Sequence, residues 1–158
     1  MPMLTTWQPV AFGDFNADGK GDVFWRNVAL GETSVWLMNG VWPSTTVRSS
    51  PLAAAWTVSG SADFNGDRKD DLYLRHTATG GTAIWFMNGT SAANVPGPSV
   101  SPAWTAFAFG DFSADGLADV FWHNPTTGET AIWLMNGATT LSTVRSKIVS
   151  DTNWKPVP

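Results

Sequence analysis

Three polar loops hold most of the side chains that could do chemistry. Each loop has nine residues, with oxygen-bearing side chains at positions 1, 3, 5 and 9. Side chains at alternate positions of a tight turn can converge on a hard cation, and the backbone carbonyl of position 7 can add a ligand. The expected metal ligands are Asp14, Asn16, Asp18, Lys20 and Asp22 in the first loop, Asp63, Asn65, Asp67, Lys69 and Asp71 in the second, and Asp111, Ser113, Asp115, Leu117 and Asp119 in the third.

A calcium ion suits these loops better than a plain turn does. Asp, Asn and Gly favour turns without any metal, but nine of the 13 acidic residues occupy positions 1, 5 and 9 of the loops. Two carboxylates about 5 Å apart repel by roughly 3 kcal/mol at an effective dielectric constant near 20. Mg²⁺ requires a tighter octahedron, and an EF-hand would place Glu where Trp25 stands. We expect about one Ca²⁺ per loop, three per chain.

The loops belong to a threefold internal repeat. Segments 7–40, 56–89 and 104–137 align without a gap, and the first and third agree at 22 of 34 positions. The leading Trp recurs at spacings of 49, 48 and 50 residues, at Trp7, Trp56, Trp104 and Trp154. Residues 151–158 therefore look like the start of a fourth unit or a closing strand.

Each unit is expected to form four short strands. In the first unit these are residues 7–14, 23–27, 33–38 and 45–49, and Asn39-Gly40 is typical of a hairpin turn. The fourth strand is expected at residues 94–100 in the second unit and 143–149 in the third. Pro96 and Pro98 restrict the former to a sheet edge.

The third strand of each unit indicates how the sheets pack. Residues 35–38 and 84–87 are apolar on both faces, so each sheet must be covered on both sides. Stacked four-stranded antiparallel sheets satisfy this in a β-propeller, and a repeat near fifty residues matches one blade. A β-sandwich with the same number of strands is the alternative. The sequence predicts an all-β propeller segment whose blades cover about residues 5–52, 53–101 and 102–150 of a single repeat domain 1–158.

Three blades do not close a propeller, which usually needs four to eight. An open wedge would expose two broad Trp-rich faces, beyond the apolar patch that a monomer tolerates. A homo-oligomer is therefore expected, and a dimer would give a ring of six blades. The segment around Trp154 could then pair with a neighbouring blade. Seven blades in a longer parent protein also fit the sequence.

The units resemble the FG-GAP or VCBS repeats of integrin-like β-propellers, a family that includes propeller lectins. Residues 12–19 (FGDFNADG) and 109–116 (FGDFSADG) carry the pattern. The resemblance implies four-stranded blades and one structural Ca²⁺ per loop. The second unit departs from it, with Ser61-Ala62 in place of Phe-Gly and Arg68 in place of Gly19. A non-Gly residue there must accept a strained turn, which Gly66 relieves in part.

Composition excludes several classes of protein. A net charge of −4 argues against nucleic-acid binding, and no apolar run is long enough to insert into a membrane. The absence of cysteine removes disulfides and thiolate chemistry. No signal peptide is visible, but weak calcium sites would fill only outside cells, so an extracellular or secreted setting is expected.

An enzyme is not expected, because the two histidines, His76 and His123, fall in different units and have no evident partner set. A recognition module for a glycan or a cell-surface protein is favoured, with carbohydrate as the leading ligand. A structural or assembly segment that uses Ca²⁺ only for stability is the alternative. The repeated Trp residues are interpreted as core. The candidate ligand contacts are Trp42, Arg26, Arg75 and His123.

Overall fold

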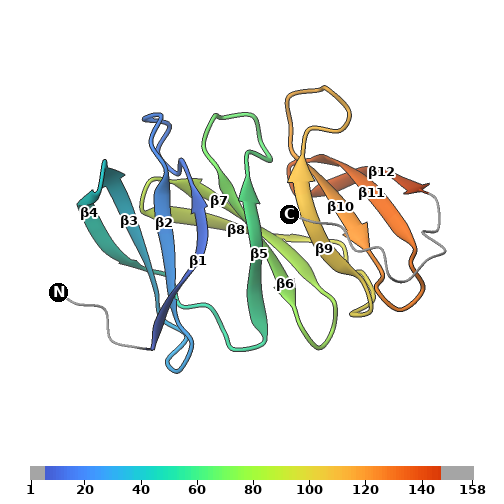
Figure 1. The fold of residues 1–158 in the computed structure, drawn as a ribbon, viewed down its shortest axis with the longest axis horizontal. Coiled ribbons are helices and arrows are strands. Elements are labelled where there is room, and N and C mark those ends of the chain that lie inside the picture. The colour runs from blue at the N-terminus through green and yellow to red at the C-terminus, as the bar shows by residue number, and fades with distance from the viewer. Residues whose placement is uncertain (1–5, 147–158) are drawn as a thin grey trace.

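The computed structural model describes residues 6–146, and the expected fourth unit at 151–158 lies outside them. Twelve strands and no helix are present in this range, so the all-β prediction is confirmed (Figure 1). The strands are β1 (Trp7–Gly13), β2 (Asp22–Asn27), β3 (Thr33–Asn39), β4 (Trp42–Ser49), β5 (Trp56–Ala62), β6 (Asp71–His76), β7 (Thr82–Asn88), β8 (Ser91–Gly97), β9 (Thr105–Gly110), β10 (Asp119–His123), β11 (Thr130–Asn136) and β12 (Thr139–Ser146).

Each repeat forms one antiparallel sheet in which sequential strands are neighbours. The orders are β1-β2-β3-β4, β5-β6-β7-β8 and β9-β10-β11-β12. Asn39 pairs with Trp42 and Asn88 with Ser91, so the two turn residues between the third and fourth strands are Gly40-Val41 and Gly89-Thr90. Each turn begins one residue later than the predicted Asn-Gly pair, and only the Gly of that pair has a positive φ. The fourth strands begin about three residues earlier than the sequence predicted. Pro96 lies in β8, an edge strand as expected.

The sheets stack face to face as blades of a propeller. β1 packs beside β5, and β5 packs beside β9, so the first strands of the three blades line one side of the stack (Figure 1). One apolar cluster joins Phe15, Phe24 and Val35 of blade 1 to Leu72 and Trp85 of blade 2. A second cluster joins Phe64, Tyr73 and Ile84 of blade 2 to Val120 and Trp133 of blade 3. The core therefore lies between the blades rather than within any one of them.

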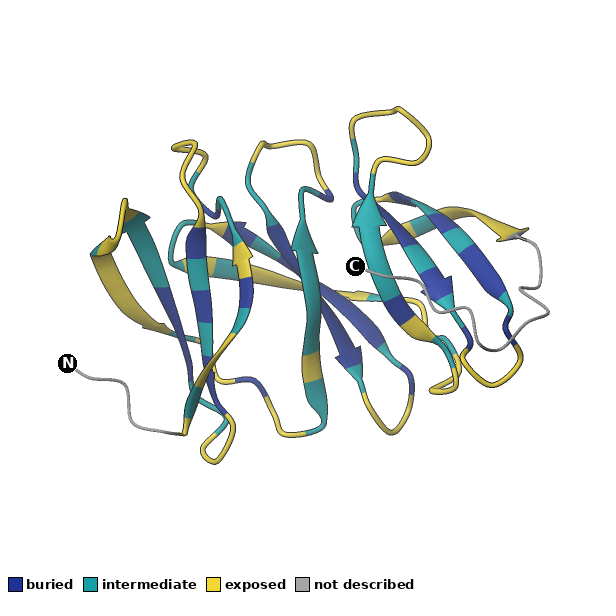
Figure 2. Cartoon of the chain, viewed as in Figure 1, coloured by how far each residue is buried: buried dark blue, intermediate teal, exposed yellow. Residues whose placement is uncertain are grey.

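Burial follows from this stacking. In β7 of the middle blade, Ala83, Ile84 and Trp85 are all buried, which confirms that both faces of that sheet are covered. Figure 2 shows the buried residues concentrated in the middle strands, whereas β4 at the outer edge of blade 1 is largely exposed. The outer faces of blades 1 and 3 have no covering blade within the described residues.

Candidate functional site

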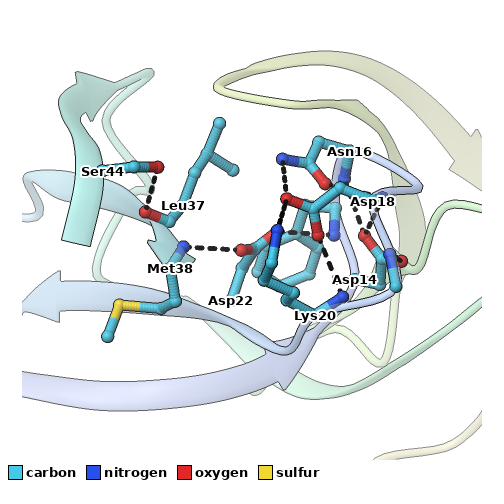
Figure 3. A network of polar contacts seen from close by, with 10 residues as sticks. Asp14, Asn16, Asp18, Lys20, Asp22, Leu37, Met38 and Ser44 are labelled. Carbon is cyan, nitrogen blue, oxygen red and sulfur yellow. Dashed lines mark hydrogen bonds and ion pairs between the residues drawn. The ribbon is translucent and has the colours of Figure 1, made fainter. Parts of the chain in front are cut away.

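The three Asp loops lie along one edge of the molecule, each joining the first and second strand of its blade (Figure 1). They share this edge because the first strands of the three blades run in the same direction. In the first loop, the Asp14 carboxylate accepts hydrogen bonds from the amides of Asp18 (3.1 Å) and Gly19 (2.7 Å). Asp18 in turn accepts the amide of Lys20 at 2.9 Å (Figure 3).

The same arrangement recurs in the other two loops. Asp63 accepts the amides of Gly66 and Arg68 at 2.7 and 2.8 Å. Asp111 accepts the amides of Asp115 and Gly116 at 3.1 and 2.8 Å. The amide of Gly116 and the neighbouring loop amides lower the pKa of Asp111, because hydrogen bonds to a carboxylate favour its charged form. The position-1 carboxylate therefore organises each loop.

The position-9 Asp has a different setting, because it is completely buried in every blade. Asp22 accepts the amide of Phe15 at 2.9 Å. It also accepts the amide of Met38 at 2.9 Å (Figure 3) and so ties the start of the loop to β3. The corresponding bonds of Asp71 and Asp119 go to the amides of residues 64 and 87 and of residues 112 and 135, at 2.8–3.0 Å. These carboxylates link the metal-type loop to the body of the blade.

Burial acts against the charge on Asp22 and Asp71. It raises the pKa of Asp22, and it raises that of Asp71 to about 7, although two backbone amides oppose the shift in each case. The nearby carboxylates of Asp67 and Asp63 raise the pKa of Asp71 further. A cation in the loop would reverse this electrostatic penalty.

The side chains at positions 1, 3, 5 and 9 of the loops supply oxygen donors, which is the donor chemistry that Ca²⁺ requires. A carboxylate oxygen that accepts one amide retains a second lone pair for a cation. Among residues 6–146, however, no three acidic or histidine side chains gather as metal ligands. Position 5 instead pairs with a lysine: Lys20 Nζ lies 3.2 Å from Asp18 Oδ2, and Lys69 Nζ lies 3.0 Å from Asp67 Oδ2. The donors fit calcium, and a bound ion would replace these ammonium groups.

Each loop contains two residues in the left-handed region, at positions 4 and 6. They are Ala17 and Gly19 in the first loop, with φ of 61° and 80°, and Gly66 and Arg68 in the second, with φ of 78° and 68°. Arg68 thus adopts a conformation that favours glycine, as the sequence predicted, and Gly66 occupies the other left-handed position. The third loop follows the first, with Ala114 and Gly116.

Arg26 and Arg75 lie at the junctions between blades. Arg26 donates to the carbonyls of Leu52, Ala53 and Trp56, at 2.6–3.3 Å, in the linker and first strand of the next blade. Both guanidinium side chains belong to buried residues, so they hold the linker rather than face solvent.

Arg75 makes the corresponding contacts with the next linker. It donates to the carbonyls of Gly80, Ser101 and Trp104, and it lies over the Trp122 ring, 5.0 Å from the centroid. His123 stands at this position in blade 3 and is half-buried. Trp42, the remaining candidate ligand contact, is 76% exposed at the start of β4.

Two equivalent pockets open where a linker enters the next blade, and sequence reasoning missed both. Each has a volume of about 240 Å³. The first junction pocket is lined by the linker residues 51–53 and, in blade 2, by Trp56, Leu74, Trp85 and Asn94, among others. The second junction pocket is lined by the linker residue Val100 and, in blade 3, by Trp104, Trp122, Ala131, Trp133, Thr143 and Arg145. The sequence does contain a sign of the pockets, because each repeat has both a leading Trp and a Trp in its third strand. That pattern is equally typical of a buried core.

The second junction pocket has the richer chemistry. Trp122 replaces the leucine found at this position in the other pocket, and its indole N–H is buried without a hydrogen-bond partner among the described residues. Thr143 and Arg145 of β12 are exposed and supply polar groups at the same pocket. Three indole rings and two polar side chains therefore line one small cavity.

Blades of four antiparallel strands, stacked through interlocking cores with Asp loops on one edge, define an integrin-like β-propeller module. The chain belongs to the FG-GAP-like repeat family, whose model matches residues 14–74 and again residues 63–122. Each match begins at a loop Asp and ends within the second strand of the following blade. No curated protein matches the sequence. The described residues contain no helix of the length and apolar character needed to cross a membrane.

Proposed function

We propose that this chain is a Ca²⁺-binding, extracellular recognition module whose second junction pocket binds a carbohydrate. The observation that carries the proposal is the grouping of Trp104, Trp122 and Trp133 with Thr143 and Arg145 around one cavity. Aromatic faces pack against the C–H faces of a sugar ring, while a few convergent polar groups orient its hydroxyls. The unpartnered indole N–H of Trp122 adds a donor that a ligand oxygen would satisfy.

The size of the cavity favours a single sugar unit. Pockets for drug-sized ligands have volumes of roughly 300–1,000 Å³, whereas this pocket has about 240 Å³. Such a site would recognise a terminal residue of a glycan, the part that remains accessible on a cell-surface polymer or glycoprotein. The first junction pocket would bind more weakly, because Leu74 stands where the second junction pocket has the Trp122 ring.

Calcium has a structural role in this proposal. FG-GAP-like repeats are typical of extracellular, non-enzymatic proteins, where millimolar Ca²⁺ would fill sites of about 10⁻⁴ M affinity. In each loop the ion would be held by the side chains at positions 1, 3, 5 and 9 and by the carbonyl of position 7. Its removal would loosen the loop edge without altering the pocket chemistry directly.

The calcium claim is tested with the metal alone. Tb³⁺, which replaces Ca²⁺ at oxygen sites, should show luminescence sensitised by the ten Trp residues of the chain, and excess Ca²⁺ should abolish it. Isothermal titration should return about three sites. An absence of Tb³⁺ signal and of calcium heat at millimolar concentration would refute the metal assignment.

The sugar claim is tested by titrating a panel of monosaccharides in the presence of Ca²⁺ while recording Trp fluorescence. Thr143→Arg should fill the second junction pocket and abolish binding. Asn94→Arg, the equivalent change at the other pocket, is the matched control and should retain most of it. If no sugar or glycan binds the calcium-loaded protein, the alternative function as an assembly or adhesive segment without a small ligand replaces this one.

A further inference from the structure

The two blade-to-blade junctions inside the chain are built in the same way. At the first junction, the amides of Asp70 and Gly89 donate to the carbonyls of Asp14 and Phe15, at 2.8 and 2.7 Å. At the second, the amides of Ala118 and Gly137 donate to the carbonyls of residues 63 and 64, at 2.8 and 3.0 Å. The Phe beneath each junction is fully buried: Phe15 in one case and Phe64 in the other. A following blade therefore seals the loop of the blade before it.

The unpartnered face of blade 3 carries the first half of this junction. Phe112 stands at the position of Phe15 and Phe64, yet it is 48% exposed. It pairs with Phe121 at a centroid distance of 6.5 Å, as Phe64 pairs with Tyr73 at 5.5 Å. The aromatic pair is thus in place without the blade that would cover it.

The unpartnered face of blade 1 carries the second half. Trp25 and Trp36 pack at 4.9 Å with an interplanar angle of 51°, close to the 4.9 Å and 59° of their buried equivalents, Trp122 and Trp133. Gly21 and Gly40 occupy the positions of the amides that cross the internal junctions, and both are exposed. Within the described residues these amides have no partner from another blade.

One exposed aromatic residue, Phe12, indicates that the face of blade 1 would pack on the face of blade 3. Phe12 in β1 is 64% exposed, and it occupies the position of Phe109 in blade 3. Phe109 packs on the preceding blade, 5.8 Å from the Phe64 ring and 5.2 Å from the Tyr73 ring. Phe12 is therefore the side chain that would pack on a Phe112–Phe121 pair.

The geometry points to a second copy of this chain as the occupant of both faces. Blade 3 of each copy packs on blade 1 of the other, with Phe12 against Phe112 and Phe121, and the amides of Gly21 and Gly40 directed at the Asp111 and Phe112 carbonyls. The contact is head-to-tail, so it must close into a ring or extend into a filament. Two copies of residues 1–158 give six blades, within the range of closed propellers, whereas three copies would exceed it. The proposed assembly is a two-chain ring.

Blade 1 also carries the residues that correspond to the blade lining of the internal pockets, namely Trp7, Trp25, Ser34, Trp36 and Thr46. We therefore expect an equivalent pocket on blade 1. Trp25 occupies the position that Trp122 has in the second junction pocket. Its indole N–H is likewise without a hydrogen-bond partner in the described part of the chain. That sugars bind there rests on the proposed function, whereas the assembly itself does not.

The mass of the calcium-loaded chain in solution tests the assembly. Light scattering on a sizing column should give twice the 17.0 kDa of one chain. Phe112→Lys should give a folded monomer, because the residue is exposed within one copy. Leu30→Lys, at a residue 70% exposed in the loop between β2 and β3, is the matched control and should remain dimeric. A wild-type monomer at micromolar concentration, or a dimer that survives Phe112→Lys, would overturn the proposal.

Cross-linking tests the direction of the contact. The chain contains no cysteine, so the double variant Phe12→Cys with Phe112→Cys can be joined only at these two positions. A short bis-maleimide should convert it to a covalent dimer, whereas Leu30→Cys with Phe112→Cys should not react in this way. Equal yields from both pairs would contradict the head-to-tail arrangement. Both experiments are read without any sugar, so they are independent of the pocket assignment.

Discussion

At the scale of single residues, the loops show a division of labour among three carboxylates. Position 1 organises the loop backbone, position 5 faces solvent with a lysine beside it in two of the loops, and position 9 is buried beneath the turn. Spacing alone presents the three as equivalent ligands. Burial distinguishes them, and it predicts that each will respond differently to substitution.

Removing a buried carboxylate should cost more than removing an exposed one. Asp71→Ala leaves the buried amides of Phe64 and Met87 without acceptors, and each buried unsatisfied group costs about 1–3 kcal/mol. Without metal, we expect the free energy of unfolding to fall by about 2–4 kcal/mol, offset in part by the loss of a buried charge. Asp67→Ala, at an exposed position of the same loop, should change it by less than about 1 kcal/mol. Urea unfolding in a chelator measures both variants, and equal losses would contradict the division of labour.

Backbone strain at Arg68 should be removable. A non-Gly residue in the left-handed region costs roughly 1–2 kcal/mol, and Arg68 has φ of 68°. Arg68→Gly should therefore raise the free energy of unfolding by about 1 kcal/mol. Gly66→Ala introduces the same strain at φ of 78°, with Leu117 only 3.2 Å from the new Cβ, and should lower it. Thermal unfolding of the two variants checks the sign, and shifts in the same direction would contradict this account.

At the scale of elements, the junction arginines fix how one blade follows another. Arg75→Met would remove three hydrogen bonds to carbonyls and the contact with the Trp122 ring. Since hydrogen bonds of charged groups contribute about 1.5–3 kcal/mol, we expect a loss of about 2–4 kcal/mol. Arg48→Met removes an exposed ion pair with Glu32, worth about 0–1 kcal/mol, and a contact of the guanidinium with the Trp7 ring at 5.9 Å from the centroid. Chemical denaturation compares them, and a comparable loss from Arg48→Met would argue against the linker role.

The strands were predictable because the same pattern of apolar and turn residues recurs in three units. A strand that is ambiguous in one unit can be assigned from the equivalent segment of another. Turn chemistry at Asn39-Gly40 and the apolar faces around Trp85 were sufficient to predict four-stranded, doubly covered sheets. The junction contacts were not predictable. Arg26 donates hydrogen bonds to backbone carbonyls of the linker. Every residue has such a carbonyl, so the residue types of the linker do not reveal the contact.

The pockets escaped prediction for a related reason. Trp133 serves both as core and as pocket wall, so its recurrence does not separate the two roles.

At the scale of the whole molecule, calcium should act as a stabilising ligand of the folded state. A site filled at ten times its dissociation constant adds about 1.4 kcal/mol, so three sites add about 4 kcal/mol. For a chain of this length that corresponds to a rise in Tm on the order of 10 °C. Calorimetry in millimolar Ca²⁺ and in chelator measures it, with Mg²⁺ as the control ion. An unchanged Tm would argue against folded-state sites in the loops.

The alignment of the three loops on one edge also makes the molecule electrically asymmetric. Residues 14–22, 63–71 and 111–119 include ten acidic and three basic residues, a formal charge of −7 against −4 for the whole chain. Outside the loops, the described residues include four arginines and two glutamates, a formal charge of +2. In low salt, an anionic surface would repel the acidic loop edge of the metal-free protein and attract its basic remainder. The protein would therefore approach such a surface with the loop edge turned away. Divalent ions on the loop edge would weaken that preference, so ionic conditions would select which rim of the propeller meets a charged surface.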